Sequence, residues 1–594
     1  MTAPPTSVLG ISIQNFGCIR DLSVRLAAIT PVVGYNNAGK STLLRALSWL
    51  IEPKALAERD FYDPSSPVVV SGEIGGVDKA TLSKVEEKHR GKIEPYVDNG
   101  KITLRRTQLT PGGVSKDITL DFYRHDTGTW DINPTGISNA IRRLLPDIIS
   151  IGAMENATDD TSKNTNTSTI GKLLKEILAP FARKYENELS SALSELQQKL
   201  GARSLTKDEG LRKLDDTIGK HLEVVFPGIS VETHVPMPSI GDILKSTTLA
   251  VSDQFDPESR MGHPGEYGHG AQRALQIALV SALAEARADD ATITARTVIL
   301  IDEPELYLHP QAVSNLREAF TTLAQAGYQI LYTTHNGGML SPALVQDVIH
   351  VRRSIGDGPY VHEGMREALK GCHGDKGIQN EVLFRLEACN EVFFSDSILL
   401  VEGKSERVIL PRIFHRRKGR GLWAYRIGLV SMDGCSALLP MRKALNAMGL
   451  PSRAIVDLDY LFNYGLEHEY LRADDPHLTS VKNAVRELAQ AAGVSVNVHG
   501  LPPRDRREAI WCEIYKNPDA RADIGELCEK MRGSGVWVWP TGTFEAPMGL
   551  SGKTSAMHLR LLRTLERDGF DRAVVDPALI DQCIEFIYEM RLGI

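Results

Sequence analysis

Residues 397–410 read SILLVEGKSERVIL. Four apolar residues run directly into Glu402 and Gly403, and Glu406 follows one helical turn later. A short apolar run that stops at a glycine predicts a buried strand, and the residues after it predict a helix. Acids at the end of a strand often do nothing more than face solvent, but two of them at one strand–helix junction also suit a ligand site.

The chain after this stretch alternates between strand-like and helix-like segments. Further strands are expected in residues 425–434, 452–459 and 535–542, with helical runs between them. Strands that alternate with helices in this way predict an α/β unit built on a sheet.

Two more acids, Asp457 and Asp459, close the strand expected at residues 452–459. Strand alternation would point both toward one face, at the carboxyl edge of the sheet, where α/β sheets bind ligands. Glu402 and Glu406 would lie at the same edge, and four carboxylates there would repel one another unless cations lay between them. Mg²⁺ prefers oxygen ligands, and two such ions can activate water and stabilise the leaving oxygen of a phosphodiester. The pattern therefore predicts a metal site for phosphodiester hydrolysis.

A second candidate site lies near the amino terminus, where residues 34–41 read GYNNAGKS. They fit the pattern G-x-x-x-x-G-K-[ST] between an apolar strand and a helix, a context in which backbone N–H groups close around phosphates. Lys40 would reach the β- and γ-phosphates, and Ser41 would bind Mg²⁺. The nucleotide-binding residues expected here are Gly34, Asn36, Asn37, Ala38, Gly39, Lys40, Ser41 and Thr42. A glycine-rich turn without a ligand would be the plain alternative for an isolated match.

Three later segments accompany this loop. Asp302 and Glu303 follow an apolar strand, where Asp302 would bind Mg²⁺ and Glu303 would polarise the attacking water. His335 closes the next such strand, where it would sense the γ-phosphate. Residues 268–273, GHGAQR, precede a helix whose start could also face phosphate. The nucleotide contacts expected in that segment are Gly270 and Gln272.

The composition bounds the class of protein. The chain has 594 residues, a formal net charge of −7 and seven cysteines. This length predicts several domains, and the charge gives no general attraction to nucleic acid, so DNA would have to bind at local basic segments such as 415–421 and 502–509. No run reaches the roughly 18–20 apolar residues that cross a bilayer, and the amino terminus lacks a signal-peptide pattern. The cysteines form no CxxC motif, which disfavours a zinc ribbon and favours a reducing cytoplasm.

In their order along the chain, the nucleotide-binding elements resemble the ABC-type ATPase head of DNA-repair and chromosome-maintenance proteins. In that family the glycine-rich signature of one head meets the ATP held by another. The resemblance therefore implies ATP between two protomers, in a homodimer or a higher assembly. His269 is a departure, because it stands where related signatures usually carry serine.

A strand-ending glutamate with glycine after it, followed by a strand ending in Asp-x-Asp, resembles the Toprim domain of topoisomerases, primases and nucleases. Behind an ABC-type head, and with EVFFSDSILLVEGKSE at residues 391–406, the chain resembles the OLD (overcoming-lysogenisation-defect) family of ATP-powered nucleases. The resemblance implies that Gly434 lies near the metal site and that Lys553 neutralises charge at the scissile phosphate, although an ordinary exposed lysine is the alternative. The metal ligands that it implies are Glu402, Glu406, Asp457, Asp459 and Glu545.

The expected architecture is α/β: an ABC-type P-loop ATPase head with an inserted helical dimerisation region, followed by a Rossmann-like Toprim domain. The expected bounds are 1–154 and 251–365 for the head, 155–250 for the insertion, 366–395 for a linker and 396–594 for the Toprim domain. The insertion opens with a polar loop at 155–171 and a long amphipathic helix at 170–201, which would form a dimer contact or an ordinary helix seam.

The expected function is nucleotide-regulated, metal-dependent cleavage or nicking of DNA, double-stranded or already nicked, without a covalent protein intermediate. ATP and Mg²⁺ would be the cofactors, with Mn²⁺ or Ca²⁺ also suited to the Toprim site. The family implies anti-phage defence, in which a helicase or a retron RNA–DNA element can be a partner, and no membrane is expected. The alternative is an ATP-gated DNA-binding clamp with a silent Toprim domain. A topoisomerase would need a tyrosine-bearing DNA gate and a primase a zinc module, and the chain suits neither.

Overall fold

The computed structural model describes residues 6–83, 87–134, 144–152, 169–200, 207–226, 267–288, 297–341, 343–354, 356–387 and 390–592, with isolated positions between 141 and 262. Two compact units divide the chain. One consists of residues 1–11, 25–29 and 43–333, and the other of residues 12–24, 30–42 and 334–594. The expected domain bounds remain a prediction.

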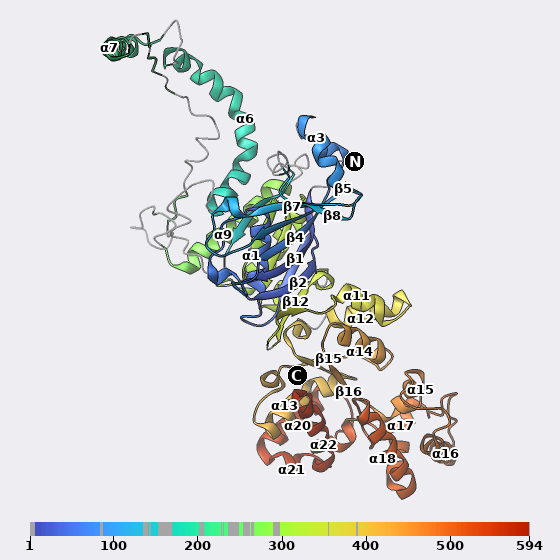
Figure 1. Ribbon diagram of the computed structural model, residues 1–594. Coiled ribbons are helices and arrows are strands. Elements are labelled where there is room, and N and C mark those ends of the chain that lie inside the picture. Colours follow the sequence, from blue (N-terminus) through green and yellow to red (C-terminus); the bar gives the residue numbers. More distant parts are fainter. Residues whose placement is uncertain are drawn as a thin grey trace. The chain divides into compact units, whose positions relative to one another are not determined.

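An antiparallel sheet occupies the first unit (Figure 1). Strand β6 (Lys101–Gln108) lies between β4 (Val68–Gly75) and β7 (Thr119–Arg124), and β8 (Thr129–Asp131) follows β7. Alternate residues of β4 are buried, which is the pattern of a sheet with one face on a core.

A parallel group of strands in the same unit leads to the acidic pair. Strand β10 (Thr297–Ile301) lies between β9 (Asp147–Ile151) and β11 (Gln329–Thr334), parallel to both. Every residue of β10 and β11 is buried, which explains the apolar runs at 298–301 and 330–332 within them. Because β10 ends at Ile301, Asp302 and Glu303 come directly after its carboxyl end.

This unit also contains several helices. The helix expected at 170–201 is α6 (Thr169–Leu200), and α7 (Glu209–Val225) comes later in the expected insertion. Most of the polar loop expected at 155–171 lies outside the described residues. Helices α9 (His269–Ala288) and α10 (Pro310–Gln325) flank β10 in the sequence.

In the second unit, β3 (Ile29–Val33) leads into the glycine-rich loop, and α1 (Lys40–Ile51) begins after it. Strand β12 (Ile349–Ser354) pairs in parallel with β3 and antiparallel with β13 (Gly358–Val361). This strand–loop–helix context is the one that the glycine-rich pattern requires.

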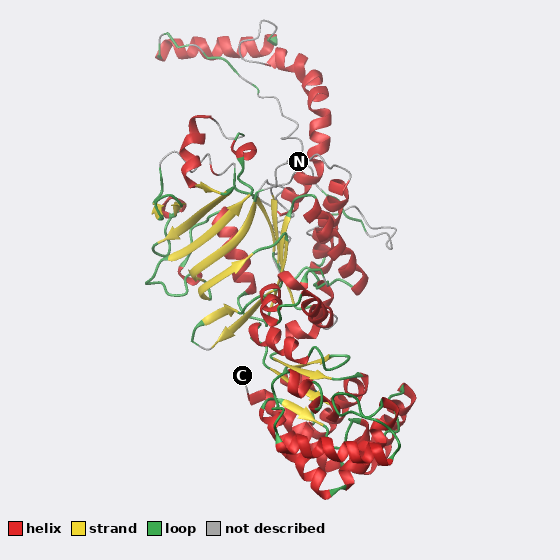
Figure 2. Cartoon of the chain, turned by 90° about the vertical axis from the view of Figure 1, so that its right-hand side faces the viewer, coloured by secondary structure: helices red, strands yellow, loops and turns green. Residues whose placement is uncertain are grey.

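A four-stranded parallel sheet forms the carboxyl-terminal part of the second unit, seen as yellow arrows among red helices in Figure 2. Its order is β15 (Ile427–Ser431), β14 (Ser397–Val401), β16 (Ser452–Val456) and β17 (Val536–Val538). Successive residues of β14 enter two different cores: Ile398 and Leu400 one, Leu399 and Val401 the other. Both faces of the sheet are therefore covered, and the expected α/β class is confirmed.

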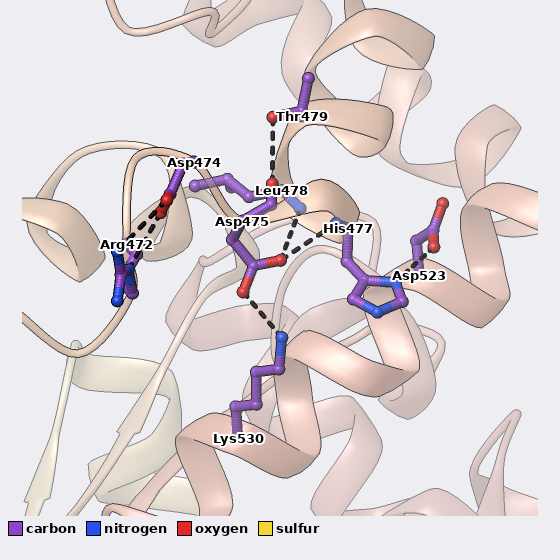
Figure 3. Close-up of polar contacts among 8 residues, drawn as sticks. All are labelled: Arg472, Asp474, Asp475, His477, Leu478, Thr479, Asp523 and Lys530. Carbon is purple, nitrogen blue, oxygen red and sulfur yellow. Dashed lines mark hydrogen bonds and ion pairs between the residues drawn. The ribbon is translucent and has the colours of Figure 1, made fainter.

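Polar contacts fasten two of the covering helices, α16 (Pro476–Ala491) and α18 (Pro518–Gly533), as Figure 3 shows. Asp475 caps α16 by accepting from the backbone N–H of His477 at 3.0 Å, and it also accepts from Lys530 Nζ at 2.7 Å. The His477 ring lies 2.6 Å from the Asp523 carboxylate. A cap of this kind typically stabilises a helix by about 1 kcal/mol.

Among the helices that the structure describes, none is both long enough and apolar enough to pass through a membrane.

Candidate active sites

The acids expected at the sheet edge meet at the ends of two neighbouring strands. Glu402 follows β14 and Asp457 follows β16, and these strands pair in parallel. Glu402 Oε2 accepts a hydrogen bond from the backbone N–H of Asp457 at 3.0 Å. The structure therefore brings Glu402 and Asp457 together from positions 55 residues apart in the chain.

A third acid and a lysine join them from the segment after β17. Lys553 Nζ lies 3.5 Å from Asp457 Oδ2 and 3.5 Å from Glu545 Oε2. Asp457 Oδ1 accepts from the backbone N–H of Phe544 at 3.2 Å, which fixes this segment beside β16. Both carboxylate oxygens of Glu545 are buried and make no hydrogen bond among the described residues.

Burial and mutual repulsion raise the pKa values of Glu402, Glu406 and Asp457. Burial, together with the charge of Asp459, raises the pKa of Glu402, and burial with the charge of Glu402 raises the pKa of Asp457 well above its ordinary value. Glu406 is buried in the first turn of α13 (Lys404–Lys418), and burial with the nearby Glu545 raises its pKa to about 7. Such shifts are what a desolvated cluster of like charges produces.

Asp459 reaches this group by a different route from the one expected. Strand β16 ends at Val456, and a 3₁₀ helix (Leu458–Leu461) begins at once, so strand alternation does not extend over the Asp-x-Asp segment. The expectation that both acids face one way because of a strand is therefore wrong. Asp459 instead accepts a hydrogen bond from Arg507 Nη1 at 2.6 Å.

Three neighbours of the acids refine this picture. Gly434, expected near the site, has a φ of 123° and donates its N–H to the carbonyl of Glu402 at 3.3 Å. Cys435 and Arg507 were missed in the sequence. Cys435 Sγ donates to Glu402 Oε2 at 3.1 Å. No sequence pattern predicts a role for Cys435. Arg507 belongs to the basic segment 502–509, where DNA contacts were expected.

The donor set suits a hard divalent cation, because it consists of carboxylates and includes the buried, unbonded oxygens of Glu545. Among the described residues, however, no three His, Cys, Asp or Glu side chains already surround a common metal position. The cation in contact with both Asp457 and Glu545 is instead Lys553, whose pKa is raised because these two carboxylates outweigh its burial.

The glycine-rich loop has the backbone of a phosphate-binding site. Gly34 and Gly39 have φ angles of 148° and 104°, and Asn37 has 64°. A Cβ at Gly34 would lie 2.1 Å from the carbonyl oxygen of Val351, so no other residue fits there. The other expected residues, Asn36, Ala38, Ser41 and Thr42, complete this loop and the first turn of α1.

Lys40 joins this loop to His335. Its Nζ donates to the carbonyl oxygens of Gly34 and Tyr35 at 3.0 and 2.9 Å, and it lies 2.8 Å from His335 Nε2. The structure thus brings together Lys40 and His335, the two residues expected at the γ-phosphate.

Asp302 and Glu303 are held by a network of their own in the first unit. Asp302 Oδ1 accepts a hydrogen bond from Thr333, and the same hydroxyl accepts the backbone N–H of Glu303 at 2.9 Å. Arg273 Nη2 donates to the carbonyls of Asp302 and Glu303 at 2.6 and 3.1 Å. Glu303 has a φ of 49°, a costly conformation for a non-glycine residue that recurs at functional sites. Thr333 and Arg273 were not expected at the site, although Arg273 closes the segment GHGAQR and Thr333 lies two residues before His335.

The expected signature residues lie at the start of α9. His269 begins the helix, and Gly270 follows it. Gln272 is buried and donates from Nε2 to the carbonyl of Tyr267 at 2.6 Å. The structure therefore places Gly270 and Gln272 at a helix N-terminus, as the sequence predicts.

A further contact links the glycine-rich loop to the sheet of acids. The Tyr35 hydroxyl donates to Asp396, which directly precedes β14. Arg426 stacks over the Tyr35 ring at 4.3 Å and lies 3.4 Å from the same carboxylate. Arg352 Nη1 lies 3.7 Å from Asp396. This contact was not expected from the sequence, because an aspartate before a strand carries no signal of its own.

Comparisons with known proteins agree with this division of sites. A model described as AAA ATPase domain matches residues 9–103 and 115–340, and one described as overcoming lysogenization defect protein-like, TOPRIM domain, matches residues 393–459. The Old nuclease of Escherichia phage P2 is 33% identical over 549 residues, covering 91% of this chain and 93% of that protein. The OLD nuclease of Thermus scotoductus is 24% identical over 68% of this chain and 73% of its own length. Endonuclease GajA of Bacillus cereus is 24% identical over 27% of this chain and 26% of its own length.

Proposed function

We propose that this chain, which belongs to the OLD family of nucleases, hydrolyses DNA with divalent metal ions at its Toprim carboxylates, under the control of nucleotide. The chain is an ATPase and an endonuclease, and an ATPase with a Toprim domain uses nucleotide and divalent metal in general. DNA as the substrate, Mg²⁺ as the ion and ATP as the nucleotide are parts of the proposal.

The observation that carries the nuclease proposal is that Asp457 lies beside both Glu402 and the ammonium group of Lys553, which also contacts Glu545. Buried carboxylates with raised pKa values are costly unless cations neutralise them. We assign Glu402, Asp457 and Glu545 as metal ligands, with Glu406 beside them. We also assign Asp459 as a metal ligand. To bind a metal ion, its carboxylate would give up the hydrogen bond from Arg507.

Metal ions bound there would supply activated water and stabilise the leaving oxygen of the scissile phosphodiester. The protein's own contribution is positional. The backbone N–H groups of Asp457 and Phe544 hold two of the carboxylates in place. Lys553 is exposed and contacts two acids, so its ammonium can turn toward a bound phosphate and neutralise part of its charge.

At the nucleotide site we assign the β- and γ-phosphates to Lys40 and the backbone of residues 34–42. His335, 2.8 Å from Lys40 Nζ, senses the γ-phosphate. From their sequence motifs, Ser41 and Asp302 are each assigned to Mg²⁺ and Glu303 to the attacking water. Gly270 and Gln272, at the start of α9, contact the nucleotide of a second protomer, which makes a homodimer part of the proposal.

The contact between Tyr35 and Asp396 supports control of cleavage by nucleotide. Tyr35 lies inside the phosphate-binding loop, and its carbonyl is held by Lys40, which would leave it for a phosphate. Asp396 begins the segment that ends at Glu402. A movement of the loop on nucleotide binding would therefore be passed to Glu402 through the Tyr35–Asp396 hydrogen bond and strand β14.

The relatives extend this proposal to its setting. They include a phage nuclease and an endonuclease, which supports a role in the conflict between phages and bacteria. A helicase or a retron RNA–DNA element as partner remains a prediction from the family resemblance.

One observation favours the second candidate, a nucleotide-gated DNA-binding clamp. Lys553 already neutralises part of the acidic group, and no three ligands among the described residues surround a metal position. A silent Toprim domain would look the same.

A plasmid-nicking assay with Mg²⁺ or Mn²⁺ separates the two. Replacing Asp457 by Asn keeps the shape of the side chain but removes the charge, so cleavage should fall at least about 100-fold while ATP hydrolysis is retained. Asp474→Asn is the matched control, since Asp474 pairs with Arg472 on the surface. Cleavage by Asp457→Asn at the native rate would refute the metal site, and a native chain that binds DNA without nicking it would establish the clamp.

A further inference from the structure

A cavity of about 1070 Å³ lies beside α13, outside the acidic site. Arg407, Arg412 and Arg416 of that helix line it. Arg412 and Arg416 are one helical turn apart and share a face, and Arg407 lines the cavity from an earlier turn. The opposite face of α13 is buried and carries Glu406, one of the acids of the cluster. The cavity and the acidic site therefore lie on two faces of one helix.

The basic segment 415–421 divides into two groups. Arg417 and Lys418 form ion pairs with Asp581 and Glu585 of α22 (Pro577–Tyr588), so their charges serve the fold. Arg416 faces the cavity instead, as does Arg407. In the described part of the chain, neither of these two guanidinium groups forms an ion pair. Their charges are available for a ligand.

The cavity also contains an exposed indole. Trp423 is 81% exposed, whereas Trp49, Trp511, Trp537 and Trp539 are buried and Trp130 is half-buried. A Cβ on Gly421 would lie 2.7 Å from Trp423 Nε1, so the ring lies close over this glycine. Leu562 and Leu565 of α20 (Ser555–Asp568) supply an apolar wall. Exposing this large aromatic surface to water costs free energy, and a ring stacked on the indole would remove that cost.

We propose that this cavity binds a single-stranded segment of DNA, with Trp423 stacking on an unpaired base and the three arginines contacting the backbone phosphates. An aromatic platform beside a row of cations is the combination by which proteins hold single strands without reading their sequence. A duplex keeps its bases stacked inside and presents no free base face to the indole. Glu391 and Glu566 also line the cavity, so phosphate must approach along the arginine side.

This proposal adds to the proposed nuclease function, and the choice of DNA as the ligand rests on that function. It adds a feature of the substrate: an unpaired stretch next to the cleavage position, held by the helix that carries Glu406. A frayed end, a gap or a displaced strand would satisfy it, whereas a fully paired linear duplex would not.

The test is a binding measurement without metal, so that cleavage plays no part. Oligothymidylate added to the full chain in EDTA should quench the tryptophan fluorescence, and the quenching should weaken as salt rises. By anisotropy with a labelled oligothymidylate, Trp423→Ala should weaken binding about 10-fold, while Trp423→Phe should bind but lose the quenching. Arg416→Ala should lower the slope of log K against log salt by about one.

Two variants serve as matched controls. Phe384→Ala removes an aromatic ring that is 74% exposed on α12 (Lys376–Glu387), and Arg486→Ala removes an exposed arginine of α16. Neither should change the affinity. Native affinity in Trp423→Ala, or equal losses in the controls, would overturn the proposal, as would a paired duplex competing as well as the single strand. If the oligonucleotide binds as proposed but nicking is never seen, the cavity assignment stands and the nuclease proposal fails.

Discussion

The hydroxyl of Tyr35 donates a hydrogen bond to the carboxylate of Asp396, which joins the phosphate-binding loop to the first residue before β14. Burial, followed by the bond to Asp396, raises the pKa of this tyrosine, so the phenol keeps its proton in any working buffer. The Tyr35 hydroxyl therefore remains a hydrogen-bond donor, and its contact with Asp396 depends on the position of the loop and not on pH.

Removing this hydroxyl should uncouple the two sites. Tyr35→Phe keeps the ring under Arg426 but loses the bond to Asp396, so ATP hydrolysis should stay within about 2-fold of native while the effect of ATP on nicking shrinks several-fold. The comparison is the nicking rate with and without nucleotide. Tyr515→Phe is the matched control, because its ring also lies under an arginine, Arg521, at 4.6 Å. An unchanged response to ATP in Tyr35→Phe would show that coupling runs elsewhere.

Much of the acidic site could be predicted because its signals are local. An apolar run that ends in Glu402 and another that ends in Asp457 define strands, and parallel strands bring their carboxyl ends to one edge. The contacts that hold this edge could not be predicted in the same way. Cys435 contacts Glu402 from 33 residues away and Arg507 contacts Asp459 from 48 residues away, and no local sequence pattern specifies such long-range contacts.

The prediction that strand alternation points Asp457 and Asp459 to the same face is wrong because the strand ends before both residues. A period of two was carried past Val456, but the backbone turns into a 3₁₀ helix there and the side chains follow a different period. A segment of five to eight residues gives no sign of where a strand stops, because the boundary is set by tertiary contacts such as the hydrogen bond from Leu458 N–H to the carbonyl of Gly542.

Loss of Lys40 should abolish nucleotide hydrolysis. Its ammonium already reaches the loop carbonyls and His335, so Lys40→Ala removes the cation from the place where phosphate charge develops, and the rate should fall at least about 100-fold. Phosphate release from ATP is the measurement. Lys101→Ala, which removes a half-buried lysine paired with Glu73, should hydrolyse ATP normally. Hydrolysis by Lys40→Ala at the native rate would mean that the nucleotide site is misassigned.

Metal binding should stabilise the fold through Glu545. Its two buried oxygens have no hydrogen-bond partner among the described residues, and the contact with Lys553 at 3.5 Å compensates only part of its charge without metal. Glu545→Gln should raise the melting temperature in EDTA by a few degrees, since a gain of about 1 kcal/mol corresponds to roughly 2–4 °C for a domain of this size. The same variant should lose most of the further rise that Mn²⁺ gives the native chain.

The control for that experiment is Glu529→Gln on α18, where the side chain is exposed and lies near Arg532. It should melt like the native chain in EDTA and keep the full response to Mn²⁺. A Glu545→Gln variant that melts lower in EDTA and still responds to Mn²⁺ would place the metal elsewhere.

Acid should destabilise the protein through His350 in β12. Burial, then the charge of Arg352, lowers the pKa of this imidazole to about 3, and its Nδ1 is buried without a hydrogen-bond partner in the described part of the chain. The unfolded chain takes up the proton near pH 6.5, whereas the folded chain does not until far lower pH. His350 therefore contributes stability that is complete above about pH 7 and is lost as the pH falls, by about 2 kcal/mol at pH 5.

Urea unfolding of the full chain between pH 5 and pH 7.5 measures this loss. His350→Gln cannot take up the proton, so its midpoint should depend less on pH than that of the native chain, with the difference concentrated below pH 6.5. His499→Gln is the matched control, because His499 is exposed and should leave the native slope unchanged. If His350→Gln and the native chain lose stability in parallel as the pH falls, the imidazole is protonated in the folded state and the packing around β12 must open to admit the charge.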